Sequence, residues 1–181
     1  MIQVPSARRL EDVGAALCAS AQHHGAAVLA ITHLGKLIQS ASRDSTHDAI
    51  VYTICQSELY AALLSADVRF AAFLPCRISA IGQPSGVMLE TMSPRQFCGL
   101  IQRSDLERLV APLETLLKDL MEDVAQPARF PINPAHSSAY GSQGAVETQV
   151  SHHGTIPQRV DCHGTKLEDI GGTGKMDSPG G

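Results

Sequence analysis

The stretch that decides the fold is His47–Arg77, with the sequence HDAIVYTICQSELYAALLSADVRFAAFLPCR. It begins with an apolar, β-branched run, Ala49–Ile54, which predicts a strand that ends at Cys55. A helix capped by Ser57 is expected next, because its apolar residues recur at helical spacing. Leu74-Pro75-Cys76 then opens a second apolar run. The stretch therefore predicts a strand, a helix and a strand, with a cysteine at the edge of each strand.

The residues before this stretch predict a first helix and another strand. Ser6 can cap a helix whose apolar positions fall on one stripe, and Gly25 supplies a left-handed residue at its end. The near-continuous apolar run from Ala26 to Leu34 is typical of a buried strand. Gly35–Ser45 is polar and is expected to form a loop or a short helix.

The residues after this stretch predict a hairpin and two helical segments. The hairpin joins Cys76–Gly82 to Val87–Met92 through a turn at Gln83-Pro84-Ser85-Gly86. A short helical piece is expected after Ser93-Pro94. The last helix is expected to start with a capping box at Ser104–Glu107 and to kink or restart at Pro112. Helices thus alternate with strands, which predicts a small α+β sandwich of one sheet with about four or five strands and helices on one face.

Composition divides the chain into two parts and limits its class. Residues 1–125 carry the periodic pattern and are expected to form the domain, whereas residues 126–181 are rich in Gly, Pro, Ser and His and are expected to be a disordered tail. A net charge of −4 argues against a nucleic-acid binder. No apolar run approaches the length of a membrane span, and no secretory signal is evident. We therefore expect a cytoplasmic protein that contacts neither nucleic acid nor membrane.

The five cysteines are expected to be free thiols, because their number is odd and their spacing is neither dense nor of the CxxC type. Cys55 lies just before a helix N-terminus, where the dipole can lower a thiol pKa, and Cys76 begins the neighbouring strand. If the strand ends meet, the pair could bind a metal, carry a persulfide or form a redox disulfide. The alternative is that both are small buried apolar residues.

Histidines supply the other candidate ligands. His33 ends a predicted strand and His47 begins one, so either could act as a base or metal ligand at a sheet edge. Both could equally be solvated side chains. In the tail, Cys162-His163 and His152-His153 lack the paired spacing of a structural zinc site. No cofactor is evident, although a metal remains possible.

The order of these elements resembles the bacterial domain-of-unknown-function family 302 over about residues 3–125. The resemblance rests on His24–Leu29, on Ser57–Leu64 and above all on Phe73-Leu74-Pro75-Cys76 followed by the hairpin. It implies a compact α+β domain that commonly self-associates, and it implies no particular activity. The chain departs from the family where Cys55-Gln56-Ser57 replaces a Cys-Asn-Pro or Gly-Asn-Pro turn.

Three hypotheses for function follow. The first is a self-associating cytoplasmic domain that binds a small ligand or partner near the Cys55 and Cys76 strand ends. The second is a thiol-based redox or sulfur-handling protein, with Cys55 as the nucleophile and Cys76 as the resolving thiol. The third is a metal- or haem-binding protein that uses Cys55, Cys76, His33 and His47, although the chain has no C-x-x-C-H motif for covalent haem.

Overall fold

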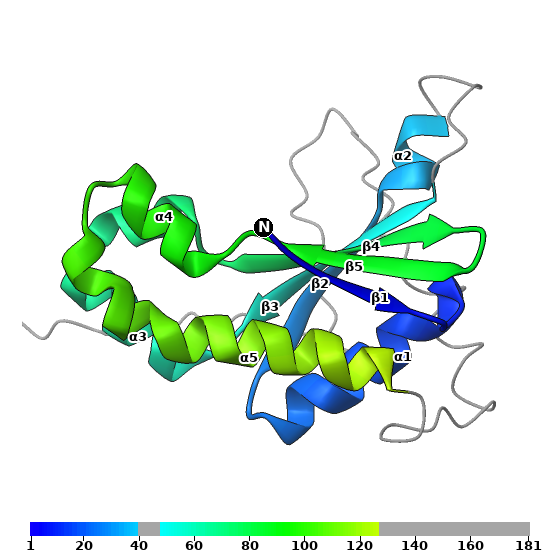
Figure 1. Ribbon diagram of the computed structural model, residues 1–181, viewed down its shortest axis with the longest axis horizontal. Coiled ribbons are helices and arrows are strands. Elements are labelled where there is room, and N and C mark those ends of the chain that lie inside the picture. Colours follow the sequence, from blue (N-terminus) through cyan, green and yellow to red (C-terminus); the bar gives the residue numbers. More distant parts are fainter. Residues whose placement is uncertain (40–47, 127–181) are drawn as a thin grey trace, which may run out of the picture.

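Five antiparallel strands form one sheet in the order β1-β5-β4-β3-β2 (Figure 1). This computed structural model describes residues 1–39 and 48–126. The strands are β1 (Ile2–Ser6), β2 (Ala27–His33), β3 (Ala49–Cys55), β4 (Cys76–Gln83) and β5 (Gly86–Thr91). The helices are α1 (Leu10–His23), α2 (Leu34–Gln39), α3 (Ser57–Ala66), α4 (Pro94–Leu100) and α5 (Glu107–Ala125), with 3-10 turns η1 (Val68–Ala72) and η2 (Ser104–Leu106).

One face of the sheet carries the helices and the core, as the sequence predicted. Helices α1 and α5 lie on the same side of the sheet, where α1 contacts β2, β3 and β4 and α5 contacts β1 (Figure 1). Side chains alternate along each strand, so Ile50, Tyr52 and Ile54 of β3 are buried beneath these helices. The apolar stripe of α5 closes the same core through Leu113, Leu117 and Leu120.

The opposite side of the sheet is called here the open face. It is formed by the alternate residues of the three central strands, which are half-buried or exposed, whereas their neighbours are buried. Its members are Ala49, Val51, Thr53 and Cys55 of β3, Arg77, Ser79 and Ile81 of β4, and Met88 and Glu90 of β5. Neither α1 nor α5 covers this face (Figure 1).

The hairpin formed by β4 and β5 was predicted correctly to within one residue at its ends. Gln83 pairs with Gly86, so Pro84 and Ser85 form a two-residue loop. Gly86 has a φ of 139°, and a Cβ built on it would lie 2.2 Å from the carbonyl oxygen of Ser6. Glycine is therefore required there by the close approach of β1, which pairs with β5 at the sheet edge.

Three details of the predicted elements were wrong. Strand β2 is an edge strand and not a buried one. Its Leu29, at a bulge between Val28 and Ala30, is 38% exposed. Ser6 belongs to β1, and α1 begins at Leu10 without a side-chain cap. At the last helix, Ser104 lies in the 3-10 turn η2, and α5 runs from Glu107 through Pro112 as one helix.

A buried carboxylate fixes α1 against α5. Asp123 is 1% exposed; Ser20 Oγ donates to its Oδ2 at 2.8 Å, and His24 Nε2 lies 2.9 Å from the same oxygen. At the end of α5, Arg8 Nε donates to the carbonyl oxygen of Val124 at 2.6 Å and satisfies a helix-terminal acceptor. Ser20 and His24 thus hold the C-terminal end of α1 against α5, and Arg8 holds the segment that leads into α1 against the end of α5.

Several expectations fall outside the described residues. His47 belongs to residues 40–47, which are not described. Of the expected tail, residues 126–181, only Gln126 is described. Among the residues that the structure describes, no helix combines the length and the apolar character that a membrane span requires.

Candidate functional site

Cys55 and Cys76 occupy neighbouring strand ends but opposite faces of the sheet. Cys76 pairs in register with Ile54, and both side chains lie on the buried, helix-covered side. Cys55 is one residue further along β3, so its side chain points to the open face and is half-buried. Both are free thiols. A disulfide requires the two Cβ atoms to approach within about 4 Å, which this alternation opposes.

The Cys76 thiol is protonated at neutral pH. Its side chain is 2% exposed, and burial raises its pKa to about 11, with the nearby Cys55 adding to the shift. The Tyr60 hydroxyl lies beside it, accepts the Cys76 N–H at 2.8 Å and donates to the carbonyl oxygen of Ile54 at 2.5 Å. Burial also raises the pKa of Tyr60, so this bridging phenol stays neutral. The arrangement joins α3 to two strand ends and does not activate a thiolate.

The helix cap beside Cys55 differs from the expected one. Gln56, and not Ser57, is the N-cap of α3, and its Oε1 accepts the Leu59 N–H at 2.7 Å. The Gln56 carbonyl oxygen also accepts the Tyr60 N–H at 3.0 Å. The Leu59 N–H, one of the first-turn amides without a partner in the helix backbone, is therefore occupied by the Gln56 side chain rather than free to stabilise a negative charge on Cys55.

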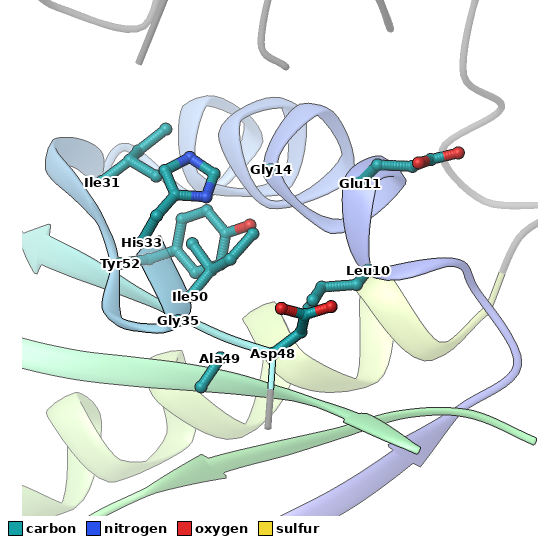
Figure 2. Close-up of a pocket in the computed structure, with 10 residues that line it drawn as sticks. All are labelled: Leu10, Glu11, Gly14, Ile31, His33, Gly35, Asp48, Ala49, Ile50 and Tyr52. Atoms are coloured by element: carbon teal, nitrogen blue, oxygen red, sulfur yellow. The ribbon is translucent and has the colours of Figure 1, made fainter. Parts of the chain in front are cut away.

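A pocket lies at the other end of β3 (Figure 2). Its volume is about 350 Å³, within the lower part of the range typical of small-ligand sites. Three separate segments build it: the first turns of α1, the junction of β2 and α2, and the start of β3. The lining residues are Leu10, Glu11, Gly14, Ile31, His33, Gly35, Asp48, Ala49, Ile50 and Tyr52.

The polar groups of the pocket come from all three segments. Tyr52 rises from the buried face of β3, and its side chain is 1% exposed. Burial, together with the nearby Cys18, raises the pKa of Tyr52 above its usual value, so its hydroxyl is neutral. This hydroxyl bonds to no described side chain, and it is open to the pocket, since no fully buried side-chain nitrogen or oxygen in the described residues lacks a partner. Figure 2 shows the His33 ring beside the Tyr52 ring and the Asp48 carboxylate beside Leu10, while the Glu11 carboxylate is directed outward.

Two backbone features shape the pocket. Gly14 of α1 faces Tyr52, and a Cβ on Gly14 would lie 3.4 Å from both the Tyr52 Cε1 and hydroxyl oxygen atoms. The absence of that side chain lets the phenol reach toward α1. Asp48 is held by the Gly82 N–H, which donates to its carbonyl oxygen at 2.8 Å. This hydrogen bond ties the start of β3 to the end of β4 and fixes the position of the Asp48 backbone.

The structure separates the residues that the sequence singled out. His33 pairs with Ile50 and lines the pocket, whereas Cys55 is five residues further along β3. At about 3.4 Å per residue, this places His33 on the order of 17 Å from the cysteine end of the sheet. Within the described ranges, no group of three or more His, Cys, Asp or Glu side chains is positioned to hold a metal ion. His47 lies outside those ranges.

The sequence did not identify Tyr52, Asp48 or Gly14 as site residues. Two signals were present: a phenol at a core position of an apolar strand, and a glycine inside an amphipathic helix. Neither signal predicts a pocket by itself. The pocket forms because the strand register places Ile31 opposite Tyr52 and because α1 packs across both strands.

Comparison with known proteins gives the family and the fold. The family model described as "Domain of unknown function DUF302" matches residues 2–124. Among solved structures, the chain is similar to the crystal structure of an uncharacterized conserved DUF302 protein from Bacillus stearothermophilus. The identity is 17% and the TM-score 0.65, and the match covers 68% of this chain and 96% of that one. No curated protein matches the chain.

Proposed function

The chain belongs to the family of domains of unknown function DUF302, and from that premise we propose that it is a self-associating domain that binds a small ligand. The pocket between α1, β2 and β3 holds the ligand, rather than the strand ends at Cys55 and Cys76.

The observation that carries the ligand-binding proposal is the Tyr52 hydroxyl. The hydroxyl belongs to a side chain in the wall of a pocket of about 350 Å³ that is lined by apolar residues and a few polar groups, the mixture typical of small-molecule sites. It bonds to no described residue, and every fully buried side-chain nitrogen or oxygen in the described residues has a partner, so this hydroxyl is open to the pocket. A bound molecule can therefore hydrogen-bond it there.

A ligand-observed screen tests the ligand-binding proposal. Saturation-transfer NMR on the full chain with a library of small fragments would find binders, which are then measured with Ile31→Trp. The larger side chain projects from the pocket wall, so it should abolish binding of those fragments. Leu100→Trp is the matched control, since Leu100 is exposed on α4 outside the pocket. Fragments that bind the Ile31→Trp protein unchanged would refute the pocket as the site.

The thiol-based alternative is supported only by the partial exposure of Cys55 at the end of β3. A resolving thiol must reach the nucleophile, whereas Cys76 is buried on the opposite face of the sheet. We therefore favour binding over redox or sulfur transfer, and metal or haem binding has no ligand cluster in the described residues to support it.

Self-association is proposed through the open face, with a second copy of this chain as the occupant. The centre of this face is apolar, since Val51, Ile81 and Met88 lie on adjacent strands. It also carries one charge of each sign, Arg77 on β4 and Glu90 on β5. Arg77 is exposed and has no ion-pair partner among the described residues, whereas Glu90 accepts from Gln3 at 2.6 Å.

In a two-fold dimer, the apolar centre and the two charged residues of the open face meet their counterparts on the second copy. Stacking two open faces about a two-fold axis buries both apolar centres and can bring Arg77 of each copy to Glu90 of the other. Charge complementarity of this kind fixes the register of an interface. Analytical ultracentrifugation of charge-reversed variants tests the arrangement, as set out below.

We also propose a cytoplasmic location. The support is that Cys55, Cys76 and Cys98 are free thiols, as is usual in a reducing compartment. Fractionation of cells that express the tagged full chain would test it, and recovery outside the cytoplasm would contradict it.

A further inference from the structure

The charge of the pocket lining is one-sided. Glu11 and Asp48 are both acidic, and none of the ten lining residues is Lys or Arg. The Glu11 carboxylate lies 2.5 Å from the Arg9 guanidinium and turns away from the pocket (Figure 2). Asp48 is exposed, and its carboxylate forms no ion pair with any described side chain. In Figure 2 this carboxylate lies beside Leu10. Among the described side chains, Asp48 therefore leaves one negative charge without a counter-ion at the pocket.

The other polar groups of the lining are the Tyr52 hydroxyl and the His33 ring. A carboxylate accepts only, while a phenol and a neutral imidazole can accept as well as donate. The Tyr52 hydroxyl bonds to no described residue and is open to the pocket, since every fully buried side-chain nitrogen or oxygen in the described residues has a partner. The lining contains no Lys or Arg to pair with a ligand carboxylate or phosphate. This lining suits a molecule that donates several hydrogen bonds and carries positive charge.

The other lining residues are apolar. Leu10 comes from α1, Ile31 from β2 and Ile50 from β3, so each wall of the pocket contributes one branched aliphatic side chain. With a volume of about 350 Å³, the pocket suits a compact apolar body and not an extended chain.

We propose that the pocket binds a small organic cation: a protonated amine carried on a compact apolar group, with the ammonium against the Asp48 carboxylate and the apolar group against Leu10, Ile31 and Ile50. This inference rests on the proposed ligand-binding function and names the chemical class of the ligand. An ammonium has three donors, which match the carboxylate oxygens, and its charge offsets that of Asp48.

Three probes of nearly equal size test the class of ligand. Benzylamine is cationic at pH 7, benzyl alcohol is neutral and benzoate is anionic, while all three share one aromatic ring. Each is titrated into the ¹⁵N-labelled full chain, and the amide shifts of residues that line the pocket are followed. We expect benzylamine to bind about five- to tenfold more tightly than benzyl alcohol, the gain typical of one charge-assisted contact at a partly solvated site. Benzoate should produce no saturable shift.

A matched pair of variants separates the charge from the shape of the pocket. Asp48→Asn keeps the side-chain size and should weaken benzylamine about three- to tenfold while leaving benzyl alcohol unchanged. Glu58→Gln removes an exposed carboxylate of α3, outside the pocket lining, and should change neither. Raising the salt concentration should weaken benzylamine alone.

The outcomes distinguish the class of ligand from the existence of the site. Equal or tighter binding of benzoate in the pocket overturns the cation proposal but leaves ligand binding intact, as does benzylamine binding that is unchanged by Asp48→Asn. If none of the three probes shifts pocket amides while other fragments do, the amine class is wrong. If no fragment binds there at all, the proposed function fails with it.

Discussion

The Tyr60 hydroxyl accepts the Cys76 backbone N–H at 2.8 Å and so joins helix α3 to the first residue of β4. The same hydroxyl donates to the carbonyl oxygen of Ile54, the residue that pairs with Cys76 across the two strands. A side chain thus completes the hydrogen bonding of the sheet at its cysteine end. That contact stabilises the arrangement of strand, helix and strand in this region, and no catalytic role is needed to explain the burial of Cys76.

Replacing Tyr60 tests this structural role. Tyr60→Phe leaves two backbone groups without their partner, so we expect a loss of about 1–2 kcal/mol in the free energy of unfolding, measured by urea denaturation. Tyr52→Phe is the matched control, because its hydroxyl bonds to no described residue, and we expect a loss below about 0.5 kcal/mol. Equal losses for the two variants would contradict the bridging role.

Gly86 fixes the approach of β1 to the hairpin. Gly86→Ala would place a Cβ 2.2 Å from the Ser6 carbonyl oxygen, at a φ of 139°. Because backbone must move, we expect a loss of at least about 2 kcal/mol in unfolding free energy. Gly99→Ala has nothing within 4 Å of the new Cβ and lies inside α4, so it should be neutral or slightly stabilising. A Gly86→Ala protein as stable as the parent would show that β1 does not pair as described.

Thiol labelling should modify Cys55, on the open face of the sheet, faster than Cys76, on the buried face. The thiolate is the reactive form, and burial raises the Cys76 pKa to about 11, so Cys76 is protonated at pH 8 as well as shielded. We expect iodoacetamide at pH 8 to modify Cys55 in the folded chain and Cys76 only after unfolding, as read by mass spectrometry of peptides. Rapid labelling of Cys76 in the native protein would revive the thiol-based alternative.

Charge reversal tests self-association through the open face. Arg77→Glu and Glu90→Arg should each weaken the dimer, because each creates like-charge contacts across the two-fold axis, and the double variant should restore most of the affinity. We expect roughly a five- to thirtyfold change in the dimer dissociation constant for each single variant, corresponding to about 1–2 kcal/mol. Sedimentation velocity over a range of concentrations measures it.

Two controls sharpen that experiment. Val51→Asp places a charge at the apolar centre of the open face and should abolish association. Leu100→Asp adds the same charge at an exposed position on α4 and should have no effect. A chain that is monomeric before any substitution, or a double reversal that fails to recover association, would contradict the proposed interface.

Most of the fold could be predicted because its strong signals are local. The alternation of Ile50, Tyr52 and Ile54 marks a strand with one buried face, and Pro84 followed by Gly86 marks the hairpin turn. The errors came from competing partners that are distant in sequence. Ser6 looks like a helix cap, but β1 pairs with β5, and Ser6 Oγ instead accepts the Arg8 N–H.

The position of β2 illustrates the same limit. An apolar run such as Ala27–Ile31 is typical of a buried strand, yet burial depends on the strand order, which places β2 at the edge next to β3 alone. The sequence did not predict the pocket either, because Gly14, Ile31 and Asp48 belong to three segments that meet only in the folded chain. His33 was identified as a candidate, but nothing in the sequence indicated which residues surround it.

We propose that the ligand site lies at the start of β3 and not at its cysteine end. The most direct measurement is the map of amide shift changes when a bound fragment is titrated into the ¹⁵N-labelled full chain. We expect the changes to gather at Gly14, Ile31, Ala49 and Tyr52, which line the pocket. Changes that gather instead at Cys55, Gln56 and Cys76 would contradict the claim.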